Sequence, residues 1–316
     1  MTPSPHLLGG LYMGWALGAN DAANVFGTAV ASRMLRFRTA ALLCSLFALG
    51  GAWFEGHEGL HTIGKLAGLG ITGATYTTVG AAVAMTLMTW LAIPSSTSQA
   101  LVGSLIAVGL MSHRPIALGA LTKVIACWIT TPFGGLLFAM LFYRLLGRVL
   151  NRLRLDLYAQ DVLLRGALVV AGCYGAYALG ANNVANVTGV YFGAGMLSAD
   201  AAVLVGAGAI ALGVLTYSHQ VMLAVGRSIV RLDAFSALVV VLAEALTVHI
   251  YAWIGVPVST SQAVVGAVLG VGLTKQATAV RFAVVGRIAM GWLATPVVAA
   301  AVSAAIYFCA HLRYIG

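Results

Sequence analysis

The stretch Gly18-Ala-Asn-Asp-Ala-Ala-Asn-Val-Phe-Gly27 returns 162 residues later as Gly180-Ala-Asn-Asn-Val-Ala-Asn-Val-Thr-Gly189. A second polar passage, Pro94-Ser-Ser-Thr-Ser-Gln-Ala100, returns as Pro257-Val-Ser-Thr-Ser-Gln-Ala263. Amides, hydroxyls and a carboxylate are costly to place in hydrocarbon. Four such clusters at matched positions of an apolar chain therefore predict one internal site built from two halves.

The rest of the chain has the composition of an integral membrane protein. Hydrophobic residues make up 61% of it, charged residues only 8%, and the mean hydropathy is +0.97. We expect an all-α fold of roughly ten to twelve helical spans in one domain, some of them short, broken or re-entrant. The helix-length apolar stretches are residues 39–54, 78–93, 115–142, 166–179, 201–217, 236–254 and 280–307.

Basic residues indicate how the two halves are oriented. Arg33, Arg36 and Arg38 follow the first span, and five arginines crowd residues 144–165, so both regions are expected in the cytoplasm. The repeat counterpart of the first basic loop, residues 195–200, contains no Lys or Arg. That loop is therefore expected outside.

The next loop shows the opposite pattern, because residues 55–65 are acidic and rich in His, whereas the counterpart region carries Arg227 and Arg231. The sequence thus predicts an inverted-topology repeat with both termini outside. Its parts are a first repeat at 1–150, a basic cytoplasmic linker at 151–165 and a second repeat at 166–316. The expected location is a plasma membrane of the bacterial inner-membrane type.

The first polar cluster carries groups for two kinds of ligand. In a helix Asn20 and Asn24 lie one turn apart, with Asp21 alongside. Gly18 and Gly27 permit either a helix break or a close backbone approach. The N–H groups at a helix start favour anions, whereas free carbonyls and Asp21 favour cations, so one site can hold an anion beside a cation.

In the second cluster Pro94 and Pro257 suit the start of a helix. The hydroxyl and amide side chains that follow each proline can cap that helix or donate to a ligand. They are Ser96, Thr97, Ser98 and Gln99 in the first copy, and Ser259, Thr260, Ser261 and Gln262 in the second.

Other interpretations stay open for individual residues. A hydroxyl can bond only to its own backbone, and an Asn can simply join two helices. Lys123 and Arg287 either reach an interface or helix end, or attract an anion. Glu244 is a candidate proton or cation group. The four histidines at 57, 61, 219 and 249 have no metal-ligand spacing and read as loop or core residues, and the four cysteines read as small core residues.

Gly-Ala-Asn-Asp followed by Ala-Asn and Gly, present in both halves and paired with Pro-x-Ser-Thr-Ser-Gln, resembles the signature of the inorganic phosphate transporter (PiT) family, which also includes sulfate permeases. The resemblance covers nearly the whole chain and implies two inverted repeats around an anion site and a cation site. It assigns the anion site to Asn20, Asn24, Ser96, Thr97, Ser98, Asn182, Asn186, Ser259, Thr260 and Ser261.

The resemblance assigns the coupling cation to Asp21 and Asn183, with Asp21 a ligand for sodium. Asn183 is a departure, since family members commonly carry Asp at this position of both repeats. Loss of one carboxylate weakens a symmetric cation site. The Asn-Asn form looks like sulfate-type members, whereas the intact Asp21 looks phosphate-type.

These observations predict a secondary active transporter that imports inorganic phosphate with a coupling cation by alternating access. The alternatives are a sulfate permease of the same family, coupled to protons or sodium, and an uncoupled anion channel. No catalytic constellation or nucleotide-binding loop is visible, so neither an enzyme nor a primary pump is expected. The expected partners are the oxyanion, a sodium ion or proton and the bilayer, without nucleic acid; a homodimer is a further expectation.

Overall fold

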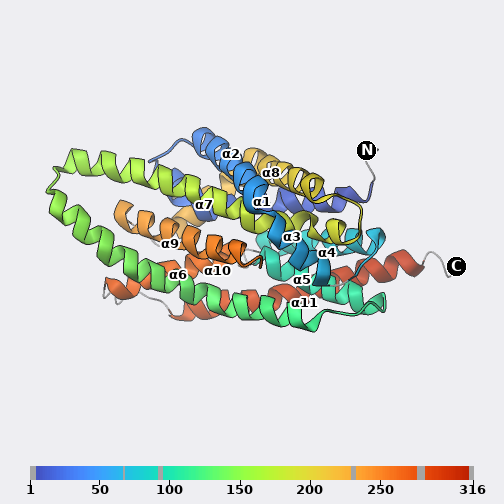
Figure 1. Cartoon of the computed structure of the whole chain (residues 1–316). Helices are drawn as coiled ribbons and strands as arrows, with labels where there is room; N and C mark the ends of the chain where they lie inside the picture. The colour runs from blue at the N-terminus through green and yellow to red at the C-terminus, as the bar shows by residue number, and fades with distance from the viewer. Residues whose placement is uncertain (1–4, 67, 92–94, 229–232, 276–281, 313–316) are drawn as a thin grey trace.

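The computed structural model describes residues 5–66, 68–91, 95–228, 233–275 and 282–312. In these ranges the chain forms eleven helices and no strand (Figure 1). Seven of the helices are long and apolar enough to cross a membrane. The protein is an all-helical, multi-pass membrane protein, as the composition predicts. The helices are α1 (Leu7–Ala31), α2 (Phe37–Glu55), α3 (His57–Leu66), α4 (Ile71–Trp90), α5 (Thr97–Met111), α6 (Leu118–Leu153), α7 (Leu157–Gly193), α8 (Ala199–Ser228), α9 (Ala234–Trp253), α10 (Thr260–Thr274) and α11 (Phe282–Leu312).

The internal repeat is visible in the order of the helices. Sequence offsets of 162 and 163 place α1, α2, α4 and α5 opposite α7, α8, α9 and α10. The long helices α6 and α11 complete the two sets, and each contains one proline, Pro132 or Pro296. The short α3 follows a break at Gly56, where α2 stops while its counterpart α8 continues.

Helices of one repeat pack against helices of the other, and glycines allow the closest crossings. A Cβ on Gly18 of α1 would lie 2.0 Å from the carbonyl oxygen of Ile210 in α8. At the repeat-related crossing of α7 and α2, a Cβ on Gly180 would lie 1.9 Å from the oxygen of Ala48. Both α1 and α7 run unbroken through these positions, so the motif glycines serve close approach and break neither helix.

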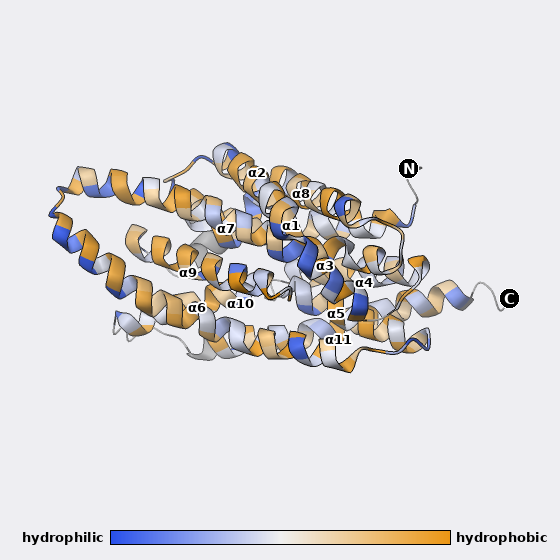
Figure 2. Ribbon diagram, in the orientation of Figure 1, coloured by the Kyte–Doolittle hydropathy of each residue, from blue (hydrophilic) through white to orange (hydrophobic). Residues whose placement is uncertain are grey.

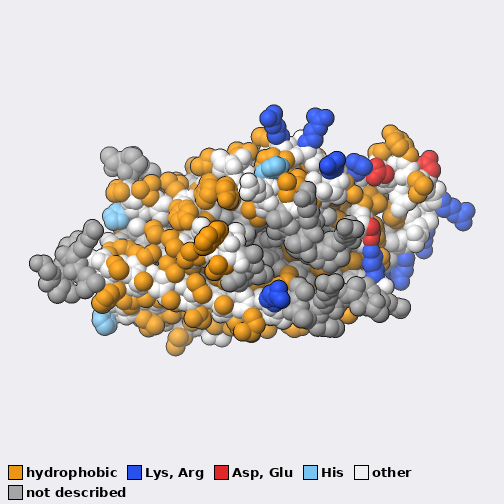
Figure 3. All heavy atoms as spheres, turned by 180° about the vertical axis from the view of Figure 1, so that it is seen from behind, with side chains coloured by type: hydrophobic (Ala, Val, Ile, Leu, Met, Phe, Trp, Pro, Cys, Tyr) orange, Lys and Arg blue, Asp and Glu red, His pale blue; other side chains and the backbone are white. Residues whose placement is uncertain are grey.

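The two ends of the molecule differ in charge. Both termini lie near one end, and the junction of α6 and α7 forms the other (Figure 1). Hydrophobic residues follow most of the long helices, whereas α3 and the region of the α6–α7 junction are more hydrophilic (Figure 2). Lys and Arg side chains gather at this junction end in the view from behind (Figure 3). The side chains of Arg227 and Arg231 lie outside the described residues.

Candidate functional site

The four polar passages meet in the interior, where α5 and α10 begin beside the middle of α1 and α7. A narrow polar pocket lies between them. Its lining consists of Asp21, Ser95, Thr97, Ser98, Asn183, Val258, Ser259, Thr260 and Ser261.

Short helices explain why the Ser-Thr-Ser-Gln passages lie here. These passages lie at the starts of α5 and α10, which have only 15 residues each. Ser96 caps α5 by accepting a hydrogen bond from the amide of Gln99 at 3.4 Å, and Ser259 caps α10 by accepting from Gln262 at 3.3 Å. Pro94 lies outside the described residues.

The two helix starts hold each other through reciprocal hydrogen bonds. Ser98 Oγ donates to the carbonyl oxygen of Val258 at 3.0 Å, and the repeat-related Ser261 Oγ donates to that of Ser95 at 3.3 Å. Each hydroxyl thus reaches the irregular segment of the other repeat. Because α5 and α10 both begin at the pocket, their positive dipole ends favour an anion between them.

Asp21 places one carboxylate in this pocket, 3% exposed. Its Oδ2 accepts hydrogen bonds from Thr97 at 3.5 Å, Thr260 at 3.2 Å and Asn183 at 3.3 Å. Its Oδ1 accepts one from Asn20 at 3.1 Å. Donors from α1, α5, α7 and α10 therefore converge on one side chain, which links both repeats.

Asn183, the repeat counterpart of Asp21, connects the Asp21 carboxylate to two neighbouring amide side chains. Its nitrogen donates to Asp21, and its Oδ1 accepts from Asn186 at 2.9 Å and from Asn182 at 3.2 Å. A carboxylate at this position would lose the donor that now reaches Asp21 and would place two negative charges side by side. An amide here is therefore compatible with an ionised Asp21.

The remaining Asn residues support the pocket from behind. Asn24 donates to Thr260 Oγ1 at 3.1 Å, and Asn186 donates to Ser98 Oγ at 3.0 Å. Asn182 forms two hydrogen bonds of 2.9 Å with the backbone of Val258, one with its N–H and one with its oxygen. The structure thus brings the sequence-predicted residues into one network, with Ser96 as a helix cap.

Two residues that line the pocket are not singled out by the sequence motifs, and three amide oxygens that the motifs include have no partner in the described ranges. Ser95 and Val258 line the pocket, and they occupy the same variable position of the repeated Pro-x-Ser motif, which hid their shared role. The amide oxygens of Gln99 and Gln262 are buried without a hydrogen-bond partner among the described residues, as is Oδ1 of Asn186. Such oxygens, together with Asp21, are ligands that suit a hard cation.

Charged residues that the sequence left open lie away from the pocket or deep in the helices. Lys123 of α6 donates to the carbonyl oxygen of Ile254 at 3.0 Å and so holds the end of α9. Arg287 is exposed on α11. Glu244 of α9 is 1% exposed, and its Oε2 has no hydrogen-bond partner within the described ranges.

The structure also shows where the cysteines and His249 lie. Cys44, Cys127 and Cys173 are buried as expected, whereas Cys309 is exposed. No cluster of three or more His, Cys, Asp or Glu suited to a metal ion occurs in the described part of the chain. His249, which looked isolated in the sequence, pairs with a carboxylate 194 positions away.

The model of the phosphate transporter family matches residues 17–161 and, a second time, residues 152–303. The chain belongs to the phosphate transporter family. The two matched segments are the two repeats, each with one copy of both polar passages.

Known proteins of similar sequence and structure agree with this family. A candidate phosphate permease of Methanocaldococcus jannaschii is 29% identical, over 91% of both chains. The sulfate permease CysP of Bacillus subtilis is also 29% identical, over 85% of this chain and 77% of its own. A solved structure named as the sodium-dependent phosphate transporter has the same fold, with a TM-score of 0.87, 24% identity and coverage of 97% and 98% of the two chains.

Proposed function

We propose that this member of the phosphate transporter family imports inorganic phosphate together with a cation, by alternating access of its two repeats. The observation that carries the proposal is the position of Asp21, whose Oδ2 lies among the hydroxyl and amide donors of a pocket between two helix starts. Donors and dipoles favour an anion, while the carboxylate repels one. A cation or proton at Asp21 removes that repulsion, so binding of the two ligands is coupled.

Membrane electrostatics explains why coupling is useful. Moving one charge against an inside-negative potential costs about 2.3 kcal/mol per 100 mV, which doubles for a dianion. Two monovalent cations cancel the charge of a dianion, and a third makes the potential assist uptake. The buried oxygens of Gln99, Gln262 and Asn186, unpartnered among the described residues, provide candidate ligands for such cations.

The proposed orientation follows from charge. The α6–α7 junction, where Lys and Arg side chains gather (Figure 3), lies in the cytoplasm, and both termini lie outside. The repeats at 1–150 and 166–316, joined by the linker at 151–165, then rock around the pocket. The plasma membrane location and a homodimer packed through Gly- and Ala-rich faces remain predictions.

Sulfate transport is the second candidate, and two observations favour it. A sulfate permease is among the similar proteins, and Asn183 replaces one of the two carboxylates expected of phosphate-type members. Phosphate remains preferred because Asp21 is retained within the hydroxyl-lined pocket. An uncoupled channel would use the same lining but would not accumulate either ion.

Uptake by purified protein in proteoliposomes tests the proposal. Labelled phosphate and labelled sulfate are supplied in parallel, with sodium and proton gradients imposed one at a time. Sodium is the first cation to test because the similar structure is named for a sodium-dependent transporter. Phosphate accumulated above equilibrium under one of the gradients is the expected result. Preferred accumulation of sulfate supports the second candidate, and flux that only follows the anion's own gradient overturns coupling.

A further inference from the structure

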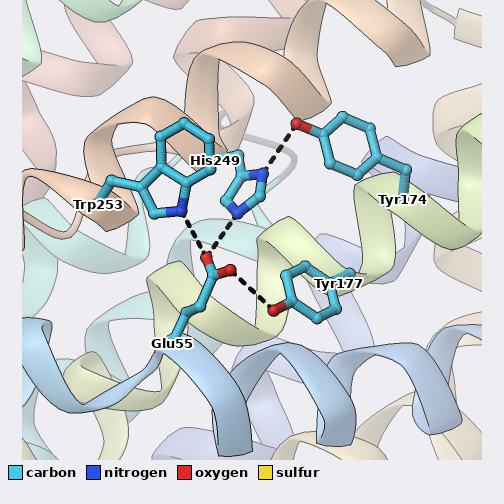
Figure 4. Close-up of polar contacts among 5 residues, drawn as sticks. All are labelled: Glu55, Tyr174, Tyr177, His249 and Trp253. Carbon is cyan, nitrogen blue, oxygen red and sulfur yellow. Dashed lines mark hydrogen bonds and ion pairs between the residues drawn. The ribbon is translucent and has the colours of Figure 1, made fainter.

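A second polar cluster lies where α2, α7 and α9 meet (Figure 4). Glu55 ends α2, and its Oε2 lies 2.5 Å from Nε2 of His249 in α9 and accepts a hydrogen bond from the indole of Trp253 at 2.8 Å. Its Oε1 accepts from the hydroxyl of Tyr177 at 2.9 Å. The hydroxyl of Tyr174 lies 2.8 Å from Nδ1 of His249. One imidazole is thus held between a carboxylate and a phenol.

The repeat-related positions contain the same arrangement without the ionisable pair. Tyr12 and Trp15 of α1 correspond to the two tyrosines of α7, and the Tyr12 hydroxyl lies 2.6 Å from Oγ1 of Thr86. Thr86 is the counterpart of His249, and Tyr217, whose ring centre lies 5.2 Å from that of Trp15, is the counterpart of Glu55. Helix packing therefore does not require a carboxylate and an imidazole at this crossing.

Among the described residues, few other ionisable side chains surround Glu55 and His249. The side chain of His249 is 8% exposed and that of Glu55 is 28% exposed, so protons can reach the pair through Glu55. The titratable groups that form hydrogen bonds with the pair are Tyr174 and Tyr177 of α7. Other ionisable side chains on or beside α9 are Glu244 of α9 itself, Lys123 of α6 at the end of α9, and Glu58 of α3, whose Cβ lies near Gly255. Residues 260–274 of α10 contain no charged side chain.

The geometry satisfies His249 in both protonation states. A neutral ring that donates from Nε2 to Glu55 accepts at Nδ1 from the Tyr174 hydroxyl. After a second proton binds, Nδ1 donates to the phenol oxygen, whose hydroxyl rotates, while Nε2 keeps its bond to the carboxylate. Hydrogen bonds between ionised groups are about twice as strong as neutral ones. The proton therefore strengthens the contact and breaks no hydrogen bond to Glu55.

This contact connects the two repeats. Glu55 belongs to the first repeat and His249 to the second. Five residues beyond the end of α9, the N–H and the oxygen of Val258 each form a hydrogen bond with Asn182, and Ser259 then caps α10. Movement of α9 against α2 is thereby transmitted to the start of α10.

We propose that His249 and Glu55 form a proton-binding site that joins the two repeats and holds them more firmly when His249 carries a second proton. Acidification between pH 8 and pH 5, the range in which an imidazole gains a proton, then slows the exchange between conformations. The effect on transport rests on the proposed function, whereas proton binding at His249 does not.

Nuclear magnetic resonance of ring-labelled histidine tests proton binding directly in the purified full chain. His249→Gln identifies the signal by its loss among the seven histidines. We expect this signal to report proton binding in the wild type and to be altered by Glu55→Gln, which removes the carboxylate beside Nε2. A ring that keeps one protonation state over the range in which an imidazole gains a proton, or a titration unaffected by Glu55→Gln, overturns the proposal.

The pH profile of uptake tests the consequence for transport. We expect acidification from pH 8 to pH 6 to slow the wild type about fivefold relative to His249→Gln, the gain from adding charge to one hydrogen bond. Phosphate itself titrates in this range, so only the ratio between variants is compared. Thr86→Val, at the repeat-related position, is the matched control and should keep the wild-type profile. Equal profiles for wild type and His249→Gln overturn the regulatory role; no phosphate uptake by any variant instead overturns the proposed function, while the titration still decides proton binding.

Discussion

The two repeats use the same backbone contacts but carry different charges. Gly18 and Gly180 meet carbonyl oxygens at equivalent crossings, and Ser98 and Ser261 donate to equivalent carbonyls. The charged groups break this symmetry, because Asp21 faces Asn183 across the pocket. Repetition therefore supplies the same scaffold to both halves, while single substitutions decide which half carries a charged side chain.

The largest expected effect comes from removing the carboxylate of Asp21, the charged group that distinguishes the two repeats. Asp21→Asn should lower cation-coupled phosphate uptake about 100-fold, because it removes the one charged acceptor shared by Thr97, Thr260 and Asn183. Initial rates in proteoliposomes under an imposed cation gradient measure the loss. Asn183→Ala, which removes a neutral side chain at the repeat-related position, is the control and should cost less. Coupled uptake at the wild-type rate in Asp21→Asn would refute the role of this carboxylate.

The shared scaffold predicts equal effects at equivalent glycines. Gly18→Ala and Gly180→Ala each force a Cβ against a backbone carbonyl, at 2.0 and 1.9 Å, and should each destabilise the fold by about 1–3 kcal/mol. Thermal unfolding in detergent provides the measurement. Gly50→Ala and Gly208→Ala are controls, since nothing lies within 4 Å of the added Cβ. Wild-type stability in either motif variant would contradict the account of the crossings.

The hydroxyls of Ser98 and Ser261, which each donate to the opposite repeat, should contribute equally to the pocket. Ser98→Ala and Ser261→Ala each remove one donor that reaches the opposite repeat, and each should raise the apparent KM for phosphate about tenfold. Uptake measured across phosphate concentrations separates this effect from turnover. Thr122→Val, which removes a hydroxyl bonded only within α6, should leave KM unchanged. A tenfold effect at only one of the two serines would argue against a pocket shared by both repeats.

The smallest expected effect comes from restoring symmetry. Asn183→Asp adds a second carboxylate beside Asp21, so anion binding should require a higher cation concentration, with a shift of about threefold. Phosphate uptake titrated with the coupling cation gives the shift, and Asn182→Asp tests whether any carboxylate in this segment has the same effect. An unchanged cation requirement would mean that Asn183 does not tune the cation site.

The sequence predicts the membrane class, the repeat and the pocket residues because these depend on composition and on motifs that occur twice. It leaves the purpose of Gly18 and Gly180 undecided, since a helix break and a close crossing require the same residue. It does not reveal Glu55 with His249, because partners on different helices, 194 positions apart, leave no local pattern. Ser95 and Val258 were hidden for a related reason, as their contribution includes the backbone oxygens that accept from Ser261 and Ser98.

The most direct test of the central claim is equilibrium binding of phosphate to purified wild type and Asp21→Asn, measured by calorimetry with and without the coupling cation. If Asp21 makes the two ligands interdependent, the cation increases the affinity of the wild type for phosphate about tenfold or more and has little effect on the variant. The same cation dependence in both proteins would contradict the account.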